Sequence, residues 1–322
     1  MAFDTGLSDP YGDWTQAPER GSPGLLSLIV GIARRVPRRI ARWLLHPIVL
    51  YFVLFSPRQV RASRQFLARV LPREPRWSDV YRHYFTFASM LLDRVYWLSP
   101  SSPDIPVRVH GAEAVAGLLD DSDRGLIVVG SHLGSFEALR GAGAAATGRR
   151  VRPLMYVANA RKVQRVLDAI NPGLEGQVIY AGRSDTMLQI HAALAAGDIV
   201  GILADRSPFD ERSVTVPFLG APAAFPIGAY RLAALADVPV VFSCAVIDGS
   251  GYSMFFHDMG RPAGRSRAER AAWIAGAAQR FAALLEQYAR AWPSNWFNFY
   301  DFWQGGGARD EATARAQAPR PQ

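Results

Sequence analysis

The sequence predicts an α/β fold: a mostly parallel mixed sheet flanked by helices, preceded by an N-terminal helical segment that associates with membranes. Short apolar runs alternate with helical stretches beyond residue 107, as in parallel sheets with crossover helices. A hydrophobic content of 49% in 322 residues is ample for a sizeable core. We expect a disordered N-terminus (1–23), a helical segment (24–100), an α/β domain (101–304) and a disordered tail (305–322).

The N-terminal segment contains the most membrane-like stretch, WLLHPIVLYFVLF, from Trp43 to Phe55. Its 13 residues are fewer than the roughly 20 that a spanning helix needs, and His46 and Pro47 interrupt it. We expect it to lie in the membrane interface, with nearby arginines facing phosphates and Trp43 at the headgroup level. A buried helix of a globular domain is the alternative.

Two further helices are expected between Arg58 and Trp97, separated by the prolines around residue 72. Within them, His83 and Asp93 are interpreted as ordinary surface or core-edge residues.

The formal net charge of +8 is carried almost wholly by arginine, since Lys162 is the only lysine. Such a surface suits anionic phospholipids, an acidic carrier protein or nucleic acid. Nucleic acid is disfavoured because no recognition helix, zinc ligand set or aromatic-basic RNA signature is present. The single cysteine, Cys244, excludes an internal disulfide and lies in an apolar run, which favours a buried small side chain.

The chemistry centres on Gly125 to Arg140, GLIVVGSHLGSFEALR. Leu126 to Val129 reads as a strand buried on both faces, and a helix begins at Phe136 with Ser135 as its cap. His132 and Glu137 therefore straddle a strand-to-helix turn, where the two side chains can converge. On one continuous helix they would point about 140° apart.

A histidine beside a carboxylate can remove a proton from a hydroxyl, with the acid fixing the imidazole's tautomer and stabilising the imidazolium. We interpret His132 as the general base and Glu137 as the residue that orients it. No serine or cysteine nucleophile is needed if the hydroxyl belongs to the substrate. The alternative is a capping histidine followed by a solvated first-turn acid.

These residues resemble the His-x4-Asp/Glu signature of the lysophospholipid acyltransferase superfamily, and more narrowly that of the lipid A late acyltransferases. The resemblance implies an O-acyltransferase at the cytoplasmic face of the bacterial inner membrane. Its donor would be an acyl carrier protein thioester or acyl-CoA, and its acceptor a hydroxyl of a glycolipid or lipid precursor. The implied partners are anionic inner-membrane lipids, the carrier protein and the acceptor. Neither a metal nor another cofactor is implied.

Further candidate binding residues follow the later strands. Asp205 and Arg206 end the strand that begins at Ile199, so they are expected at the same sheet edge as His132. Arg206 could bind a phosphate or the carrier's phosphopantetheine arm, and Asp205 could position a base or a backbone turn; a mutual ion pair is the alternative. Arg183 follows a short strand in a turn where a guanidinium could hold a phosphate.

Asn159 and Arg161 are candidates of the same kind, because in the resembled family a strand ends near the acceptor in this region. A helix cap and a solvated first turn explain these two residues equally well.

The block from Thr215 to Val241 resembles a Phe-Phe-Gly and Ala-Thr-rich block of the lipid A acyltransferases. It implies an acyl tunnel with Phe218 and Phe225 in its wall. The aromatic segment PSNWFNFYDFW, from Pro293 to Trp303, departs from that family because Asp301 stands where basic residues are common. It resembles acyltransferases of aryl-polyene and xanthomonadin-type pigment pathways, so a pigment lipid is an alternative acceptor.

Two other functions use the same residues differently. A hydrolase would direct the His132 and Glu137 pair at water, and a non-catalytic lipid-binding protein would need neither side chain. The backbone amides of the turn from Leu133 to Ser135, or Arg206, are expected to stabilise an oxyanion in the transferase. The scattered histidines show no ligand spacing, and no metal site is predicted.

Overall fold

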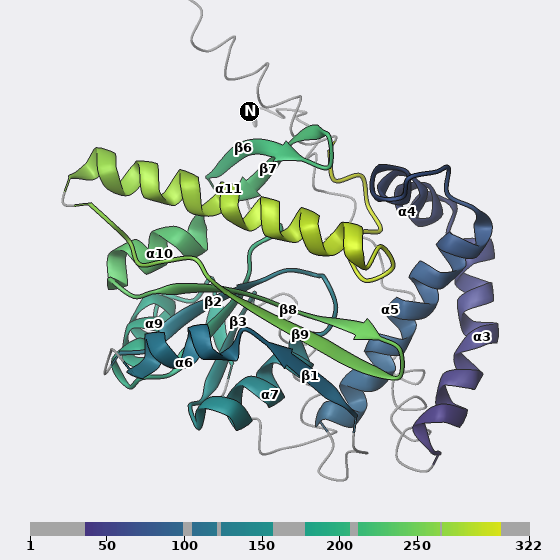
Figure 1. The fold of residues 1–322 in the computed structure, drawn as a ribbon, viewed down its shortest axis with the longest axis horizontal. Coiled ribbons are helices and arrows are strands. Elements are labelled where there is room, and N and C mark those ends of the chain that lie inside the picture. Colours follow the sequence, from purple (N-terminus) through teal and green to yellow (C-terminus); the bar gives the residue numbers. More distant parts are fainter. Residues whose placement is uncertain are drawn as a thin grey trace, which may run out of the picture.

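A computed structural model of the protein describes residues 36–98, 105–120, 124–156, 178–206, 212–264 and 266–303. They form a mixed α/β fold, as predicted (Figure 1). The main sheet has the spatial order β1-β9-β8-β2-β5-β3-β4. Its strands are β1 (Val107–His110), β2 (Leu126–Gly130), β3 (Val151–Tyr156), β4 (Ile179–Ala181), β5 (Ile199–Leu203), β8 (Val240–Asp248) and β9 (Gly251–Asp258). The predicted disordered ends lie outside the described residues.

All neighbouring strands of this sheet run parallel except β8 and β9, which form an antiparallel pair. β2 lies near the middle, paired with β5 on one side and β8 on the other. Because β2 and β5 are in parallel register, the segments that follow Gly130 and Leu203 leave the same edge of the sheet. This edge carries the candidate site.

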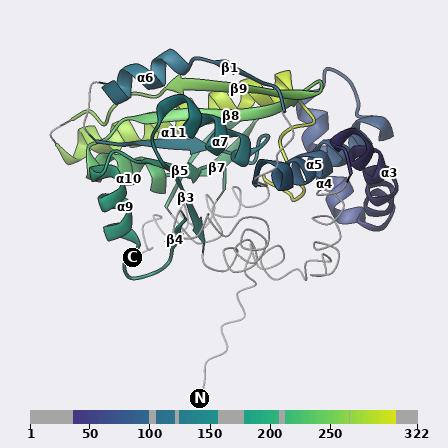
Figure 2. The same cartoon turned by 90° about the horizontal axis from the view of Figure 1, so that it is seen from below.

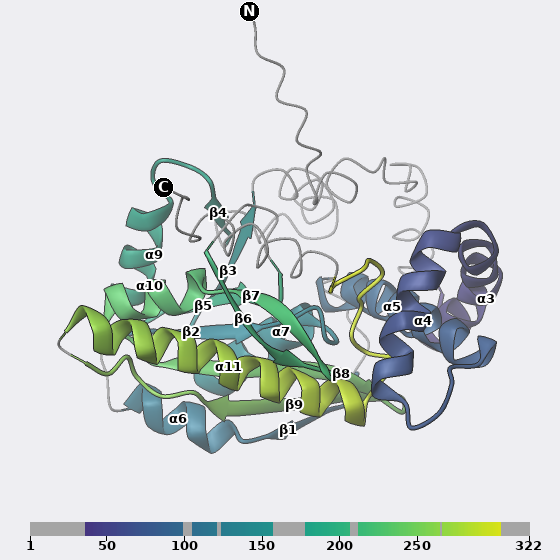
Figure 3. The same cartoon turned by 90° about the horizontal axis from the view of Figure 1, so that it is seen from above.

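Helices cover both faces of the sheet: α6 (Ala112–Asp120) and α7 (Phe136–Thr147) on one face, and α10 (Gly228–Ala236) and α11 (Arg267–Ala291) on the other (Figures 1 and 3). Side chains of β2 alternate between the two layers, as the period of a strand requires. Ile127 and Val129 share a core with α11, whereas Leu126 and Val128 share one with α6. α9 (Thr186–Ala195) packs beside β4 and β5.

Three helices gather at one end of the sheet (Figures 1 and 2): α3 (Arg38–Phe55), α4 (Pro57–Val70) and α5 (Trp77–Leu98). Pro37 directly precedes the first residue of α3. Pro47 was predicted to interrupt the apolar stretch, but α3 runs through it. A proline inside a helix removes one backbone hydrogen bond, and packing against α5 holds α3 together across that position.

Asp93 and His83 of α5 are fully buried, and the prediction that they lie at the surface or core edge was wrong. Asp93 binds both Arg38 Nε and Nη2 at 2.6 Å and accepts a hydrogen bond from the Tyr252 hydroxyl at 3.0 Å. This ion pair fastens α3 to α5 and the β8–β9 hairpin. It also turns Arg38 inward, where only 14% of its side chain is exposed.

His83 lies between Ser63 Oγ, 2.8 Å from its Nδ1, and the Trp296 carbonyl oxygen, 2.8 Å from its Nε2. Burial lowers the pKa of His83 to about 4, although the hydrogen bond to Trp296 opposes this shift. The ring is therefore neutral at physiological pH, and it joins α4, α5 and the C-terminal aromatic segment.

The outer face of α3 is apolar. Ile40, Trp43, Leu44, Leu50, Tyr51, Leu54 and Phe55 are all exposed there. Among the described residues, no single helix is long and apolar enough to cross a membrane. The pair α3 and α4 passes the test of length and composition together but is bent by 96°.

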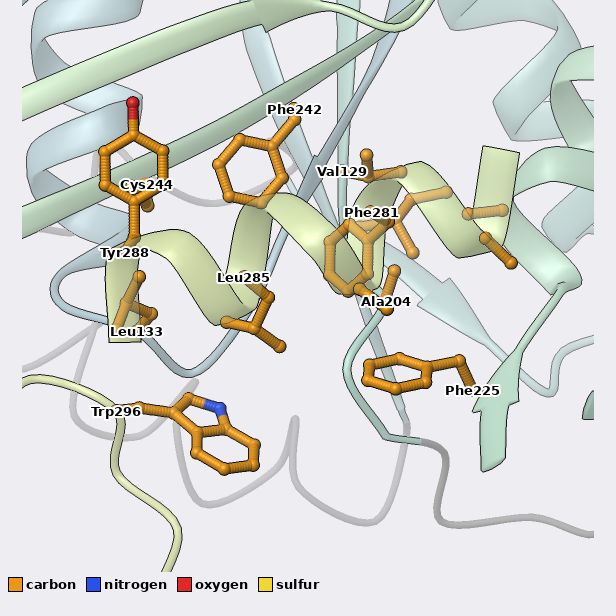
Figure 4. Close-up of a cluster of buried hydrophobic side chains, with 14 of the residues drawn as sticks. Val129, Leu133, Ala204, Phe225, Phe242, Cys244, Phe281, Leu285, Tyr288 and Trp296 are labelled. Carbon is orange, nitrogen blue, oxygen red and sulfur yellow. The ribbon is translucent and has the colours of Figure 1, made fainter. Parts of the chain in front are cut away.

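A two-stranded antiparallel sheet, β6 (Ser213–Phe218) and β7 (Ala221–Pro226), stands apart from the main sheet against α11. Its rings meet the C-terminal segment in an aromatic core, in which Phe225, Phe281 and Trp296 lie near one another (Figure 4). Phe225 packs edge-on against Phe281 of α11, and Phe218 packs edge-on against Trp296.

Candidate active site

The turn from Ser131 to Ser135 connects β2 to α7 and is held by backbone hydrogen bonds to two other segments. The Gly134 amide donates to the Asn295 carbonyl at 2.9 Å, and the Ser135 amide donates to the Ala245 carbonyl at 2.8 Å. Gly134 has a φ of 76°, and a Cβ there would lie 1.8 Å from the Ala245 oxygen. Only glycine fits this close backbone approach.

The predicted cap of α7 is confirmed, because Ser135 Oγ accepts a hydrogen bond from the Ala138 amide at 3.2 Å. The capped helix and the two anchored amides fix the turn on both sides of His132. The Phe297 amide adds a third link, since it donates to the His132 carbonyl at 2.9 Å. The histidine thus projects from a rigid backbone.

His132 lies against Asp205, which follows β5 at the same edge of the sheet. Nδ1 of the imidazole is 2.9 Å from Asp205 Oδ1, and the His132 amide donates to Oδ2 at 3.1 Å. Oδ2 also accepts from Trp296 Nε1 at 3.1 Å. Asp205 is almost fully buried, whereas 37% of the His132 side chain is exposed. The arrangement is a buried carboxylate behind an accessible imidazole.

Arg206 approaches the same ring nitrogen: its Nε is 2.9 Å from His132 Nδ1. A neutral imidazole nitrogen cannot donate to Asp205 and accept from Arg206 at once. A lone pair on Nδ1 would face the carboxylate and be repelled, so we assign the proton to Nδ1. The lone pair then sits on Nε2, which has no protein partner among the described residues. Arg206 acts on the ring mainly as a nearby positive charge.

Burial lowers the pKa of His132, and the charge of Arg206 lowers it further, while the charge and hydrogen bond of Asp205 oppose the shift. Burial alone would raise the pKa of Asp205, but His132 and Arg206 hold it well below its usual range. At neutral pH the pair is therefore a carboxylate and a neutral imidazole. That is the protonation state of a general base with its orienting acid.

Arg206 is itself held in place above the C-terminal segment. Its Nη2 donates to the Phe297 carbonyl at 3.3 Å, and its guanidinium carbon lies 5.1 Å from the centre of the Tyr300 ring. The expectation that Asp205 and Arg206 share an edge with His132 agrees with this geometry.

Glu137 makes its ion pairs away from the imidazole. Its Oε1 is 2.9 Å from Arg94 Nη2, and its Oε2 is 3.1 Å from Arg140 Nε. No hydrogen bond joins Glu137 to His132 among the described residues. The acid that contacts the imidazole in this structure is Asp205, and Glu137 instead links α7 to α5 through Arg94.

The backbone amides predicted to form an oxyanion site already have protein acceptors. The Leu133 amide donates to Ser131 Oγ at 3.3 Å, and the amides of Gly134 and Ser135 donate to carbonyl groups. The turn is built as a support for His132, and its amides are not available to a substrate. Of the two predicted sources of oxyanion stabilisation, only Arg206 is left.

The remaining predicted site residues lie elsewhere. Arg183 follows β4, three strand positions or about 14 Å across the sheet from β2, and it pairs with Asp185. Asn159 and Arg161 lie outside the described residues. Phe218 and Phe225 are buried in the aromatic core and contact each other at 5.2 Å between ring centres.

Sequence reasoning missed Arg94 and Trp296 because both contact the site from distant segments. Arg94 comes from α5, 43 positions before Glu137, and Trp296 is 91 positions beyond Asp205. The dense aromatic segment after α11 was a signal for Trp296, but nothing in the sequence tied it to Asp205. Among the described residues, no cluster of His, Cys, Asp or Glu side chains is arranged to hold a metal ion.

A buried acid, an accessible histidine and an arginine at the carboxyl edge of an α/β sheet are typical of enzymes that activate a hydroxyl. The profile of the bacterial lipid A biosynthesis acyltransferases matches residues 24–304, and the chain belongs to this family. It is therefore an acyltransferase that transfers acyl groups to a lipid. A comparison with curated proteins gives no match.

Proposed function

We propose that this enzyme moves a fatty acyl group from an acyl carrier protein thioester, or from acyl-CoA, to a hydroxyl of a glycolipid or lipid precursor. The observation that carries the proposal is the contact of His132 Nδ1 with the buried Asp205 carboxylate at 2.9 Å. That contact leaves Nε2 as the accessible base at the edge of the sheet.

His132 Nε2 takes the proton of the acceptor hydroxyl as its oxygen attacks the thioester carbonyl. The tetrahedral intermediate then collapses, the carbon–sulfur bond breaks, and the imidazolium returns the proton to the departing thiolate. Asp205 keeps the proton on Nδ1 and stabilises the imidazolium while it exists. The thioester is already activated, so these steps require no metal or prosthetic group.

Arg206 supplies positive charge where the carbonyl oxygen becomes negative. Its Nη1 has no partner among the described residues, whereas Nη2 donates to the Phe297 carbonyl and the guanidinium rests over the Tyr300 ring. A guanidinium fixed in this way stabilises an oxyanion without reorganising during the reaction. The same charge keeps His132 neutral and ready to accept a proton.

Glu137 contributes to the site by positioning two arginines. It holds Arg94 and Arg140 beside the first turn of α7, and both guanidinium groups remain partly exposed, with 29% and 16% of their side chains accessible. Such groups can recognise a phosphate of the donor or of the acceptor. Glu137 is thus a positioning residue, and its substitution affects binding of an anionic substrate more than basicity of the imidazole.

The exposed apolar face of α3 is proposed to insert into the cytoplasmic leaflet of the bacterial inner membrane. Trp43 is 76% exposed and Leu54 is 65% exposed, at opposite ends of this face. A helix that lies in the interface buries such side chains while arginines nearby meet anionic headgroups. Attachment at this end brings the enzyme to a lipid acceptor. The positive net charge also favours an acidic carrier protein as donor.

The test is transfer of a radiolabelled acyl group from an acyl carrier protein thioester to a purified lipid A precursor. The native chain should form an acylated lipid, and His132→Ala should lower turnover by about 10² to 10⁴ without changing the folded state. His191→Ala, at an exposed position on α9, is the matched control and should keep full turnover. Near-normal turnover by His132→Ala would contradict the mechanism.

A further inference from the structure

A cavity of about 210 Å³ lies between the sheet and helices α6 and α7, on the face opposite α11. Its floor is formed by the central strands and its walls by the two helices. The lining is largely apolar and includes Val115, Val128, Phe136, Leu139, Ile199 and Phe256. Beneath α11, on the other face of the sheet, aromatic rings pack against one another.

Four polar side chains border the largely apolar lining, those of Glu113, Arg140, Thr147 and Ser243, and Glu113 is exposed to solvent. Ser243 Oγ donates to the Phe255 carbonyl at 2.9 Å, and Arg140 is paired with Glu137. A buried water needs two or more polar partners to be stable, and this lining offers few. The chemistry of the cavity suits hydrocarbon.

Phe136 stands at the end of the cavity nearest the catalytic turn. It is the first residue of α7 and directly follows the anchored Ser135. Its ring lies over Gly201 of β5, where an added Cβ would be 2.7 Å from Phe136 Cζ. Glycine at position 201 is what allows the ring to rest against the sheet. The ring itself is only half buried.

The other lining residues lie progressively farther from His132. On β2 the lining residue is Val128, four residues before His132, which is at most about 13 Å along the chain. On α7 the lining extends from Phe136 to Thr147, about 16 Å of helix. A chain that starts at His132 would therefore pass Phe136 before it reaches the rest of the cavity.

We propose that this cavity receives the distal methylenes of the transferred acyl chain, and that Phe136, resting on Gly201, sets how far the chain enters. This inference rests on the proposed acyl transfer and names the part of the chain that selects the acyl length. It replaces Phe218 and Phe225 as the acyl-binding wall, because those two rings fill their space by packing on each other.

The experiment measures transfer from a series of saturated acyl thioesters that differ by two methylenes. Val115→Phe fills the cavity from the α6 wall and should move the preferred chain to a shorter one. Each excluded methylene lowers relative kcat/KM about fourfold, so excluding two lowers the ratio of long to short chains about 15-fold. Phe136→Ala should move the preference toward longer chains. Val109→Phe, at an exposed position on β1, is the matched control and should leave it unchanged.

A second measurement separates this inference from the proposed function. Unlabelled saturated fatty acids of increasing length displace a fluorescent fatty acid from the full-length protein, with no transfer required. If the native chain transfers no acyl group but Val115→Phe changes the fatty acid length that binds best, the cavity is a site for acyl chains and the proposed function is wrong. If both Val115→Phe and Phe136→Ala keep the native length profile in transfer and in binding, the inference is wrong. Should Val115→Phe fail to fold, Phe136→Ala alone decides.

Discussion

Replacing Asp205 by asparagine tests whether Asp205, rather than the Glu137 of the sequence signature, orients His132. Asp205 accepts three hydrogen bonds, from His132 Nδ1, the His132 amide and Trp296 Nε1. An asparagine has one acceptor oxygen, so its amino group must face at least one of these donors. Leaving a buried donor unpaired costs about 1 to 3 kcal/mol of stability.

The catalytic cost of this substitution is larger. If the amino group faces Nδ1, it donates to that nitrogen and moves the imidazole proton to Nε2, which removes the base. We expect turnover to fall by about 10² to 10⁴. Asp205 raises the pKa of His132. In Asp205→Asn the acid limb of the pH–activity profile, where protonation of His132 abolishes activity, should therefore move to lower pH.

Glu137→Gln is the matched variant, since it also replaces a carboxylate by an amide at the same edge. It removes the ion pairs with Arg94 and Arg140, so activity should fall through weaker substrate binding while the acid limb stays in place. The assay is acyl transfer followed by mass spectrometry across a pH series, with folding checked by circular dichroism. An acid limb that moves in Glu137→Gln but not in Asp205→Asn would refute the assignment.

Three further predictions follow from the charges and surfaces described above. Arg206→Gln removes a charge that lowers the pKa of His132, so the acid limb of kcat should move to higher pH. The pKa of His83 falls from 6.5 to about 4 on folding, so stability should be lost as pH drops from about 6.5 to about 4, by about 3 kcal/mol in total. Thermal unfolding across this pH range should show that His83→Gln loses less stability than the native chain. Leu54→Asp on α3 should weaken binding to anionic vesicles about tenfold or more, and Leu188→Asp on α9 should not.

Each of these has a contrary result. An acid limb that stays fixed or moves to lower pH in Arg206→Gln would mean that this charge does not act on the base. An equally steep loss of stability in His83→Gln would assign the acid sensitivity to other groups. Equal vesicle binding by the variants on α3 and α9 would remove α3 as the membrane-contacting helix.

The fold was largely predictable because it depends on local patterns. The apolar run from Leu126 to Val129, the cap at Ser135 and the helix from Phe136 all follow from period and capping chemistry, and the structure confirms them. The shared edge of His132 and Asp205 follows from the rule that ligand-binding residues lie at the carboxyl ends of parallel strands.

The contacts within the site were less predictable because they depend on segments far apart in the sequence. Glu137 is five residues from His132, yet its partner Arg94 arrives from α5, and Asp205 takes the place beside the imidazole. Spacing along the chain could not decide between two acids at the same edge. The same limit applies to Phe218 and Phe225, whose aromatic character fits both a tunnel wall and a filled core.

We propose that His132 acts as the base of an acyl transfer to lipid. The most direct test of this role is mass spectrometry of lipids and glycolipids from cells that lack the protein and carry either the native chain or His132→Ala. The deficient cells should contain a species lighter by one acyl group, which only the native chain converts to the full form. Restoration by His132→Ala, or no acyl difference in any extractable lipid, would contradict this proposal.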